Sequence, residues 1–318
     1  MPMLTVSQWK DARRVDHEQV VFFGHLFNRR TRPRPAYADL KVFDADVMAF
    51  AAAQTSWDKI RPLGDIIADA NQFIVNAPQN LPPRYLTAVR TLRDAAADEF
   101  STLTDGTITA ATLRSDIESI SRGAALAPNS VTVHVYAQGS NLSDATLNGR
   151  INGHLGEVNR LFNPGDVQVT RLNAALSRIS LADSPVDQGG FNEQGRAPFE
   201  LIRYIKGKNN GADVSVVYTD KFMADDVQGF TCRQGRVYSS AVPVKPIVVV
   251  TLNPPGTSTT YDTTLAHELT HGITGEGGHS NEPDSLMAKG AIRNPTAEVS
   301  FAMLAWLRSP RPMIKDEG

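Results

Sequence analysis

Two histidines four residues apart, His267 and His271, with Glu268 directly after the first, constrain this chain more than any other feature. If the segment is a helix, both imidazoles project from one face about one turn apart, close enough to bind one cation. Imidazole nitrogen suits zinc, and a catalytic zinc site usually has three protein ligands and a water. The pair therefore predicts a helix whose histidines face a cleft and share a metal with a third ligand.

Glu268 is expected to point beside the metal rather than at it. Zinc lowers the pKa of a bound water to about 7, and a neighbouring carboxylate can accept the released proton and pass it to a leaving amine. The resulting hydroxide would attack a peptide carbonyl. The five residues also occur by chance in solvated amphipathic helices, so the residues that follow must decide.

The residues after His271 add glycines, a further histidine and a methionine. Gly272 and Gly275 are expected to stop the helix and turn the chain back, because glycine adopts left-handed backbone at little cost. That turn would deliver His279 as the third ligand. Met287 follows eight residues later, within Ser-Leu-Met.

This arrangement resembles the metzincin clan of zinc peptidases, and residues 279–287 resemble the matrixin-type stretch that joins the third histidine to the methionine turn. The resemblance implies one catalytic Zn²⁺ ion held by His267, His271 and His279. It also implies that Glu268 is the general base and that Met287 forms an apolar floor under the metal.

The spacing departs from the metzincin pattern HExxHxxGxxH, because Gly277 stands where the third histidine is expected and His279 comes two residues later. The longer glycine-rich turn can absorb two residues. Carboxylates stay open as rival third ligands, and one on a later helix would give a gluzincin-like site. The four rivals are Glu276, Glu282, Asp284 and Glu298.

The pattern of the chain changes near residue 128. Apolar residues recur at helical spacing between 39 and 126, and Thr109 is placed to cap one of those helices. Further on, apolar spacing predicts a helix over 147–162, a short helix near 199–205, and strands at 131–136, 167–172, 212–219 and 247–252. A final helix is expected to begin at 294–296 and to close the second domain.

We therefore predict an α+β chain in two parts. Residues 1–127 form a mostly α-helical region of unknown role, and residues 128–318 form a metzincin-like α/β catalytic domain with a twisted sheet, an active-site helix and a methionine turn. In that family the substrate lies along an edge strand, which is expected here between Gly229 and Val244. The implied partner is a protein or peptide substrate.

Composition narrows the alternatives. The formal net charge of −2 gives no field to attract nucleic acid, and no apolar run is long enough to span a membrane. The single cysteine, Cys232, excludes an internal disulfide and a cysteine-rich zinc site. We expect no classical signal peptide, so the compartment stays open, with export by a non-classical route as one option. The sequence sets no oligomeric state.

Two other classes of function stay open. One is a zinc-binding interaction module or inactive peptidase homologue that uses the cleft to bind a partner. Glu268 argues against it, because a structural zinc site normally fills all four positions with cysteine and histidine. The other is a bacterial effector or toxin, in which the helical part serves delivery.

Overall fold

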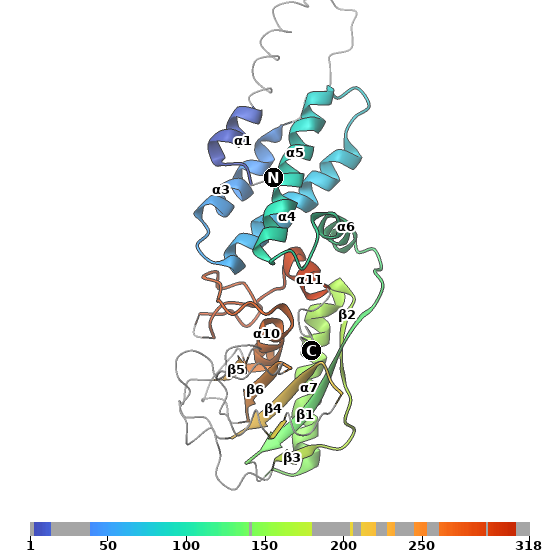
Figure 1. Cartoon of the computed structure of the whole chain (residues 1–318), viewed down its shortest axis with the longest axis vertical. Coiled ribbons are helices and arrows are strands. Elements are labelled where there is room, and N and C mark those ends of the chain that lie inside the picture. Colours follow the sequence, from blue (N-terminus) through green and yellow to red (C-terminus); the bar gives the residue numbers. More distant parts are fainter. Residues whose placement is uncertain are drawn as a thin grey trace, which may run out of the picture. The chain divides into compact units, whose positions relative to one another are not determined.

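Figure 1 shows the computed structural model of the chain. The structure describes residues 3–13, 39–139, 142–179, 204–205, 211–220, 228–232, 245–252, 261–290 and 292–309. The chain divides into two compact units, a helical unit of Met1–Leu126 with Ser300–Trp306 and an α/β unit of Ala127–Val299 with Leu307–Gly318. Within the described residues, no helix has both the length and the apolar character needed to cross a membrane.

In the helical unit, capping side chains set the starts of helices such as α4 (Ser56–Asn76) and α6 (Ala110–Ser121). Thr55 and Thr109 each accept a main-chain hydrogen bond from the residue three positions on, at 3.1 Å, which confirms the predicted cap at Thr109. The helices are α1 (Val6–Arg13), η1 (Leu40–Phe43), α3 (Asp44–Ala52), α4 (Ser56–Asn76), α5 (Pro83–Leu103), α6 (Ala110–Ser121) and α11 (Phe301–Leu307).

The last helix differs from its prediction in both start and place. α11 begins at Phe301, not at 294–296, because the amide of Glu298 bonds back to the carbonyl of Asp284. Ser300 then accepts from the amide of Met303 as a cap. The helix packs in the helical unit, where the ring of Trp306 lies 5.0 Å from that of Trp57. It therefore does not close the second domain as expected.

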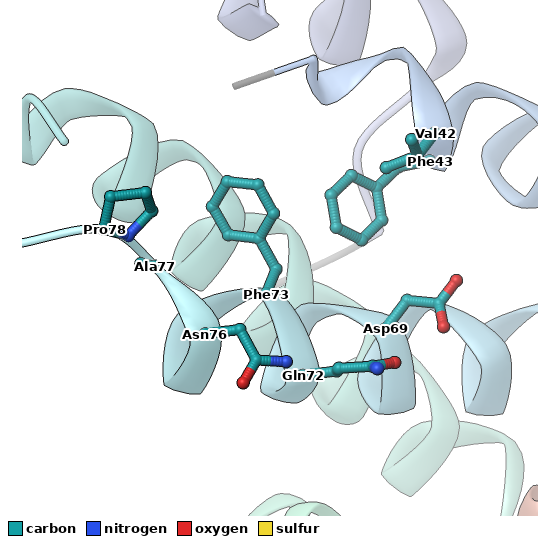
Figure 2. Close-up of a pocket in the computed structure, with 8 residues that line it drawn as sticks. All are labelled: Val42, Phe43, Asp69, Gln72, Phe73, Asn76, Ala77 and Pro78. Carbon is teal, nitrogen blue, oxygen red and sulfur yellow. The ribbon is translucent and has the colours of Figure 1, made fainter. Parts of the chain in front are cut away.

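A cavity of about 490 Å³ opens on the helical unit between η1 and the C-terminal half of α4 (Figure 2). Phe43 and Phe73 line it with their rings 6.2 Å apart, and Asp69 adds a carboxylate. Burial raises the pKa of Asp69. Burial, and then the negative charge of Asp69, raise the pKa of Asp46 on α3.

The α/β unit is organised around a sheet, as predicted, and the described strands of that sheet are mostly parallel. Its described strands are β1 (Asn129–Gln138), β2 (Val167–Arg171), β3 (Ser177–Ile179), β4 (Val214–Thr219), β5 (Gly229–Cys232) and β6 (Ile247–Thr251). Their order is β2-β1-β4-β6-β5, with β3 also paired to β1, and only β5 runs antiparallel. Figure 1 shows β1, β4 and β6 side by side.

The strands follow from the sequence pattern. Every residue of β4 and β6 is buried, as expected for β-branched runs with neighbours on both sides. β5 is the terminal strand of the described sheet and lies inside the segment where an edge was predicted; residues 233–244 lie outside the described residues. Of the short helix predicted near 199–205, only 204–205 are described.

Two helices complete the unit. α7 (Asp144–Phe162) matches the predicted helix, begins at the cap Ser143 and packs against β2; the turn η2 (Asn163–Gly165) follows it. α10 (Tyr261–Thr274) packs against α7, β5 and β6. α10 carries the two histidines of the sequence motif, so the sheet edge and α7 together fix where these side chains lie.

Candidate metal centre

α10 is buried on all its faces. Every residue from 263 to 274 is buried, and seven of them are polar: Thr263, Thr264, His267, Glu268, Thr270, His271 and Thr274. Buried polar groups are costly unless they are hydrogen-bonded. The hydroxyls of Thr270 and Thr274 donate to carbonyls four residues earlier, at 2.8 and 2.7 Å. The hydroxyl of Thr264 donates to Oε1 of Gln228 at 2.9 Å, and the side chains of His267 and His271 meet at one site.

Three imidazoles meet at this site. One ring nitrogen from each of His267, His271 and His279 lies within 4.8 Å of the other two, and among the described residues these three form the one group of histidine, cysteine or carboxylate side chains arranged to hold a metal ion. The ring centroids are 4.7 to 5.3 Å apart. Residues far apart in the motif are thus brought into one cluster.

The tautomers of the first two imidazoles are fixed by main-chain carbonyls. Nδ1 of His267 lies 2.7 Å from the carbonyl oxygen of Leu286, and Nδ1 of His271 lies 2.6 Å from that of Glu276. Because a carbonyl only accepts, each Nδ1 must carry its ring's hydrogen. Each neutral ring therefore presents an unprotonated Nε2 to the site, as in metal-bound histidines.

The two Nε2 atoms, on His267 and His271, face each other at 3.2 Å. With both hydrogens on Nδ1, this contact places two lone pairs together, which is unfavourable unless a cation lies between them. Two ligands of a tetrahedral zinc ion, each with a Zn–N distance of about 2.0–2.1 Å, are separated by about 3.3 Å. The donor set and its spacing therefore fit zinc.

Burial also keeps His267 neutral. Desolvation lowers the pKa of His267 well below its usual value, and the proximity of a second imidazole, His271, and of the Arg293 cation lowers it further. A neutral imidazole is the form that binds a metal.

A glycine turn delivers the third imidazole. α10 ends at Thr274, and Gly275 follows with φ +74°, donating its amide to the carbonyl of His271 at 2.9 Å. This is the left-handed helix end predicted for Gly275. Gly272, in contrast, was expected to stop the helix and lies inside it: a Cβ there would meet Pro246 at 3.3 Å, so the glycine serves close packing.

Glu268 lies on the β5 side of α10. The hydroxyl of Thr231 on β5 is 2.8 Å from Oε2 and 2.7 Å from the main-chain oxygen of Glu268, and both can accept its hydrogen. A Cβ on Gly229 would come within 3.0 Å of Cγ of Glu268 and 2.8 Å of the methyl of Thr264. The bare glycine and the hydroxyl together set the position of the carboxylate.

The rival carboxylates are placed elsewhere. Glu276 accepts from the amide of Gly278, Asp284 is exposed and pairs with the side chain of Asn294, and Glu298 is exposed. None of the four rivals belongs to the group around His267. The extended turn thus brings a histidine to the cluster, and the two extra residues are accommodated by the glycines.

Of the other histidines, His134 and His154 make ordinary structural contacts, as expected, whereas His17 and His25 lie outside the described residues. His134 bonds to Ser177 at 2.8 Å, and His154 bonds through Nδ1 to the hydroxyl of Tyr218 at 3.0 Å. The side chain of Cys232 lies outside the described part, so a role as an inhibitory thiol stays a hypothesis.

Two residues at the site were missed from the sequence. Thr231 belongs to a short strand 36 positions before the motif, and nothing in its spacing marks it. Arg293 is buried, 6% exposed, and donates to the carbonyl of Leu286. A lone arginine in a polar segment is ordinarily solvated. The burial of Arg293 therefore becomes visible only when the fold of the chain after Met287 is known.

Comparison with known proteins gives limited likeness. No family model matches the chain, and no curated protein matches it in sequence. Two solved structures align with 58% of it: archaemetzincin from Methanopyrus kandleri, at 17% identity over 92% of that chain with a TM-score of 0.32, and metalloproteinase-II from Bacteroides fragilis, at 16% identity over 53% of that chain with a TM-score of 0.37. The present chain thus spans about half of the Bacteroides chain. Because both TM-scores are low, the interpretation of the site depends on its own geometry.

Proposed function

We propose that the α/β unit is a zinc-dependent metallopeptidase, with His267, His271 and His279 as the metal ligands and Glu268 as the general base. The observation that carries the proposal is the inward-facing pair of Nε2 atoms 3.2 Å apart, with both Nδ1 hydrogens held by main-chain carbonyls. Such a pair is arranged for a shared cation, and a third imidazole stands beside it.

When bound, zinc supplies a water of lowered pKa and an electrophilic centre for a carbonyl oxygen. The chain's own residues do the rest. Glu268 follows the first ligand in sequence and takes a proton from the attacking water, then returns it to the leaving amine. Thr231 holds Oε2 of the Glu268 carboxylate and so fixes the position of the base.

A three-histidine site with an adjacent carboxylate favours an enzyme over an interaction module. A structural zinc site closes its fourth position with protein, whereas three ligands leave one for water. The terminal place of β5 in the described sheet supports a peptide substrate, because an extended chain can pair with a strand at a sheet edge. Endopeptidase activity is therefore the form we infer.

Bound zinc and cleavage of a mixed peptide library test the proposal together. Wild type is expected to bind one zinc per chain and to cut peptides. Glu268→Gln should keep zinc and lose about 10²–10⁴-fold in rate, because only the base is removed. His279→Ala should lose zinc affinity by more than about 100-fold, because a direct ligand matters more than the groups that orient it.

Glu298→Gln is the matched control, because it removes the carboxylate that a gluzincin-like site would use. We expect it to retain both zinc and activity. Loss of zinc in Glu298→Gln with retention in His279→Ala would transfer the third ligand to the carboxylate. Zinc binding without cleavage of any peptide would instead support the interaction module.

A further inference from the structure

Arg293 places a guanidinium behind the first imidazole. Its Nη1 donates to the carbonyl oxygen of Leu286 at 3.3 Å, and the same oxygen accepts from Nδ1 of His267 at 2.7 Å. Leu286 is fully buried and Arg293 is 6% exposed, so this contact is shielded from water. One carbonyl thus connects a buried arginine to a predicted metal ligand.

The guanidinium is charged in spite of its burial. Desolvation lowers the pKa of Arg293 to about 10, and the carboxylate of Glu268 opposes that fall. Arg293 is therefore a cation at neutral pH. A buried cation beside a site for a divalent cation weakens metal binding by repulsion, unless it contributes something else to the site.

Main-chain hydrogen bonds hold the chain around Arg293 in a compact loop, which restricts the position of the guanidinium. The amide of Arg293 bonds to the carbonyl of Lys289 at 2.9 Å, and the amide of Asn294 bonds to that of Pro283 at 2.8 Å. The amide of Leu286 is held by the carbonyl of Glu298 at 3.0 Å. Main-chain hydrogen bonds thus tie together the segment from 283 to 298, and Arg293 lies inside that segment.

We propose that Arg293 is a positioning residue of the metal centre, which fixes the Leu286 carbonyl and through it the ring orientation of His267. The inference rests on the proposed zinc site. Groups that orient a metal ligand typically contribute about 10- to 100-fold in metal affinity. The carboxylate of Glu268 partly offsets the charge of the guanidinium, and we expect the positioning effect to outweigh the repulsion.

The test compares zinc affinity in Arg293→Met, Arg293→Lys and wild type by chelator competition. We expect the zinc dissociation constant of Arg293→Met to rise about 10- to 100-fold. Arg293→Lys should lie between, because an ammonium keeps the charge and one donor but lacks the planar fork. The visible spectrum of bound Co²⁺, which depends on ligand geometry, should change in Arg293→Met and partly recover in Arg293→Lys.

Arg308 supplies a matched control. Its guanidinium also donates to main-chain carbonyls, those of Gly165 and Ala127, at 2.6 and 3.0 Å. Arg308→Met should lower stability and leave zinc affinity and the Co²⁺ spectrum unchanged. If Arg308→Met weakens zinc as much as Arg293→Met, the role of Arg293 is general stabilisation and the proposal fails.

Two further outcomes also decide. Unchanged or tighter zinc binding in Arg293→Met overturns the positioning role, even if wild type proves to be a peptidase. Wild type without zinc affinity overturns this inference together with the proposed function. Where Arg293→Met does not fold, the Co²⁺ spectrum of Arg293→Lys carries the test: a spectrum identical to wild type contradicts the proposal.

Discussion

Helices α4 and α10 differ in which kinds of residue they bury. α4 has 21 residues and buries eleven of them, of which only Asp58 and Asn71 are polar or charged. α10 buries each residue from 263 to 274, and seven of these are polar. α4 is an amphipathic helix that covers an apolar core. α10 is a buried helix that carries the polar side chains of the candidate metal site.

The free energies differ accordingly. A buried leucine or isoleucine of α4 contributes about 1.5–3 kcal/mol through removal of apolar surface from water. A buried polar group left without a partner costs about 1–3 kcal/mol, so α10 is tolerable only because its polar atoms find partners. Thr231 and the carbonyls of Leu286 and Glu276 are among those partners. α4 thus stabilises its unit, whereas α10 depends on its surroundings.

The two helices can be followed separately because all the tryptophans lie in one unit. The chain has three, and Trp9, Trp57 and Trp306 belong to the helical unit. Tryptophan fluorescence therefore reports unfolding of the unit that contains α4. Zinc affinity reports the surroundings of α10.

The largest expected effect comes from truncating the core of α4. Leu63 is fully buried, and Leu63→Ala should lower the free energy of unfolding of the helical unit by about 2–5 kcal/mol. Urea unfolding followed by tryptophan fluorescence measures this. Val75→Ala, on the same helix at a side chain 61% exposed, should stay within about 0.5 kcal/mol of wild type. Zinc affinity should be unchanged in both.

Loss of zinc affinity in Leu63→Ala, at a urea concentration where its tryptophan signal is native, would contradict the separate roles of α4 and α10. It would mean that α4 also supports the metal centre. Equal stability losses at Leu63 and Val75 would contradict the amphipathic interpretation of α4.

The sequence predicted α4 and α10 with different success. Helical periodicity between 39 and 126 and the cap at Thr109 were sufficient for the helices of that range, because local spacing reports which face is buried. For α10, the motif gave the convergence of His267, His271 and His279. It did not give Thr231, which reaches the site through the pairing of β5 with β6, or Arg293, whose segment is folded by main-chain bonds that no local pattern encodes.

The wrong predictions have the same origin. Gly272 was expected to end α10, because glycine at a helix end is common; its actual role depends on Pro246, a residue remote in sequence. The helix expected from 294–296 begins at Phe301, because the amides of Asn294 and Glu298 pair with the segment 283–284. Tertiary hydrogen bonds overrode local helix propensity there.

Substitution of one glycine near each helix tests the difference between α4 and α10 more specifically. The expected effects are smaller than that of Leu63→Ala. Gly229→Ala would place Cβ within 3.0 Å of Glu268 and 2.8 Å of Thr264, so the carboxylate must move. Peptide cleavage should fall about 10- to 100-fold with zinc retained, since small displacements of a catalytic group are costly. Initial rates at matched zinc occupancy measure it.

Gly64 in α4 is the counterpart, because a Cβ there would come within 2.7 Å of Cβ and 3.1 Å of the main-chain nitrogen of Ala302 on α11. Alanine favours a helix interior by about 1 kcal/mol, but the contact with main-chain atoms should outweigh it and destabilise the helical unit by about 1–3 kcal/mol. Cleavage should be unchanged. A stabilised Gly64→Ala, or normal cleavage in Gly229→Ala, would contradict the close approach at that glycine.

The smallest effect is a difference in the sign of pH dependence. Burial lowers the pKa of His154; the charge of Asp262 opposes the shift and that of Arg150 adds to it. The folded state then binds protons more weakly than the unfolded state, so the α/β unit should lose stability as pH falls below about 6.5. Burial raises the pKa of Asp46 and Asp69 in the helical unit. In the helical unit the folded state therefore binds protons more tightly than the unfolded state. Lowering the pH through the raised pKa values of these two groups should increase the stability of that unit.

Urea unfolding of the zinc-free protein between pH 7 and 4 measures both slopes, by tryptophan fluorescence for the helical unit and by pulse proteolysis with mass spectrometry for the α/β unit. His154→Gln should flatten part of the acid loss in the α/β unit, because the amide keeps a hydrogen-bonding group near Tyr218 and does not titrate. Asp69→Asn should flatten the gain in the helical unit. Parallel slopes in the two units would show that their titratable groups do not differ in the way that α4 and α10 indicate.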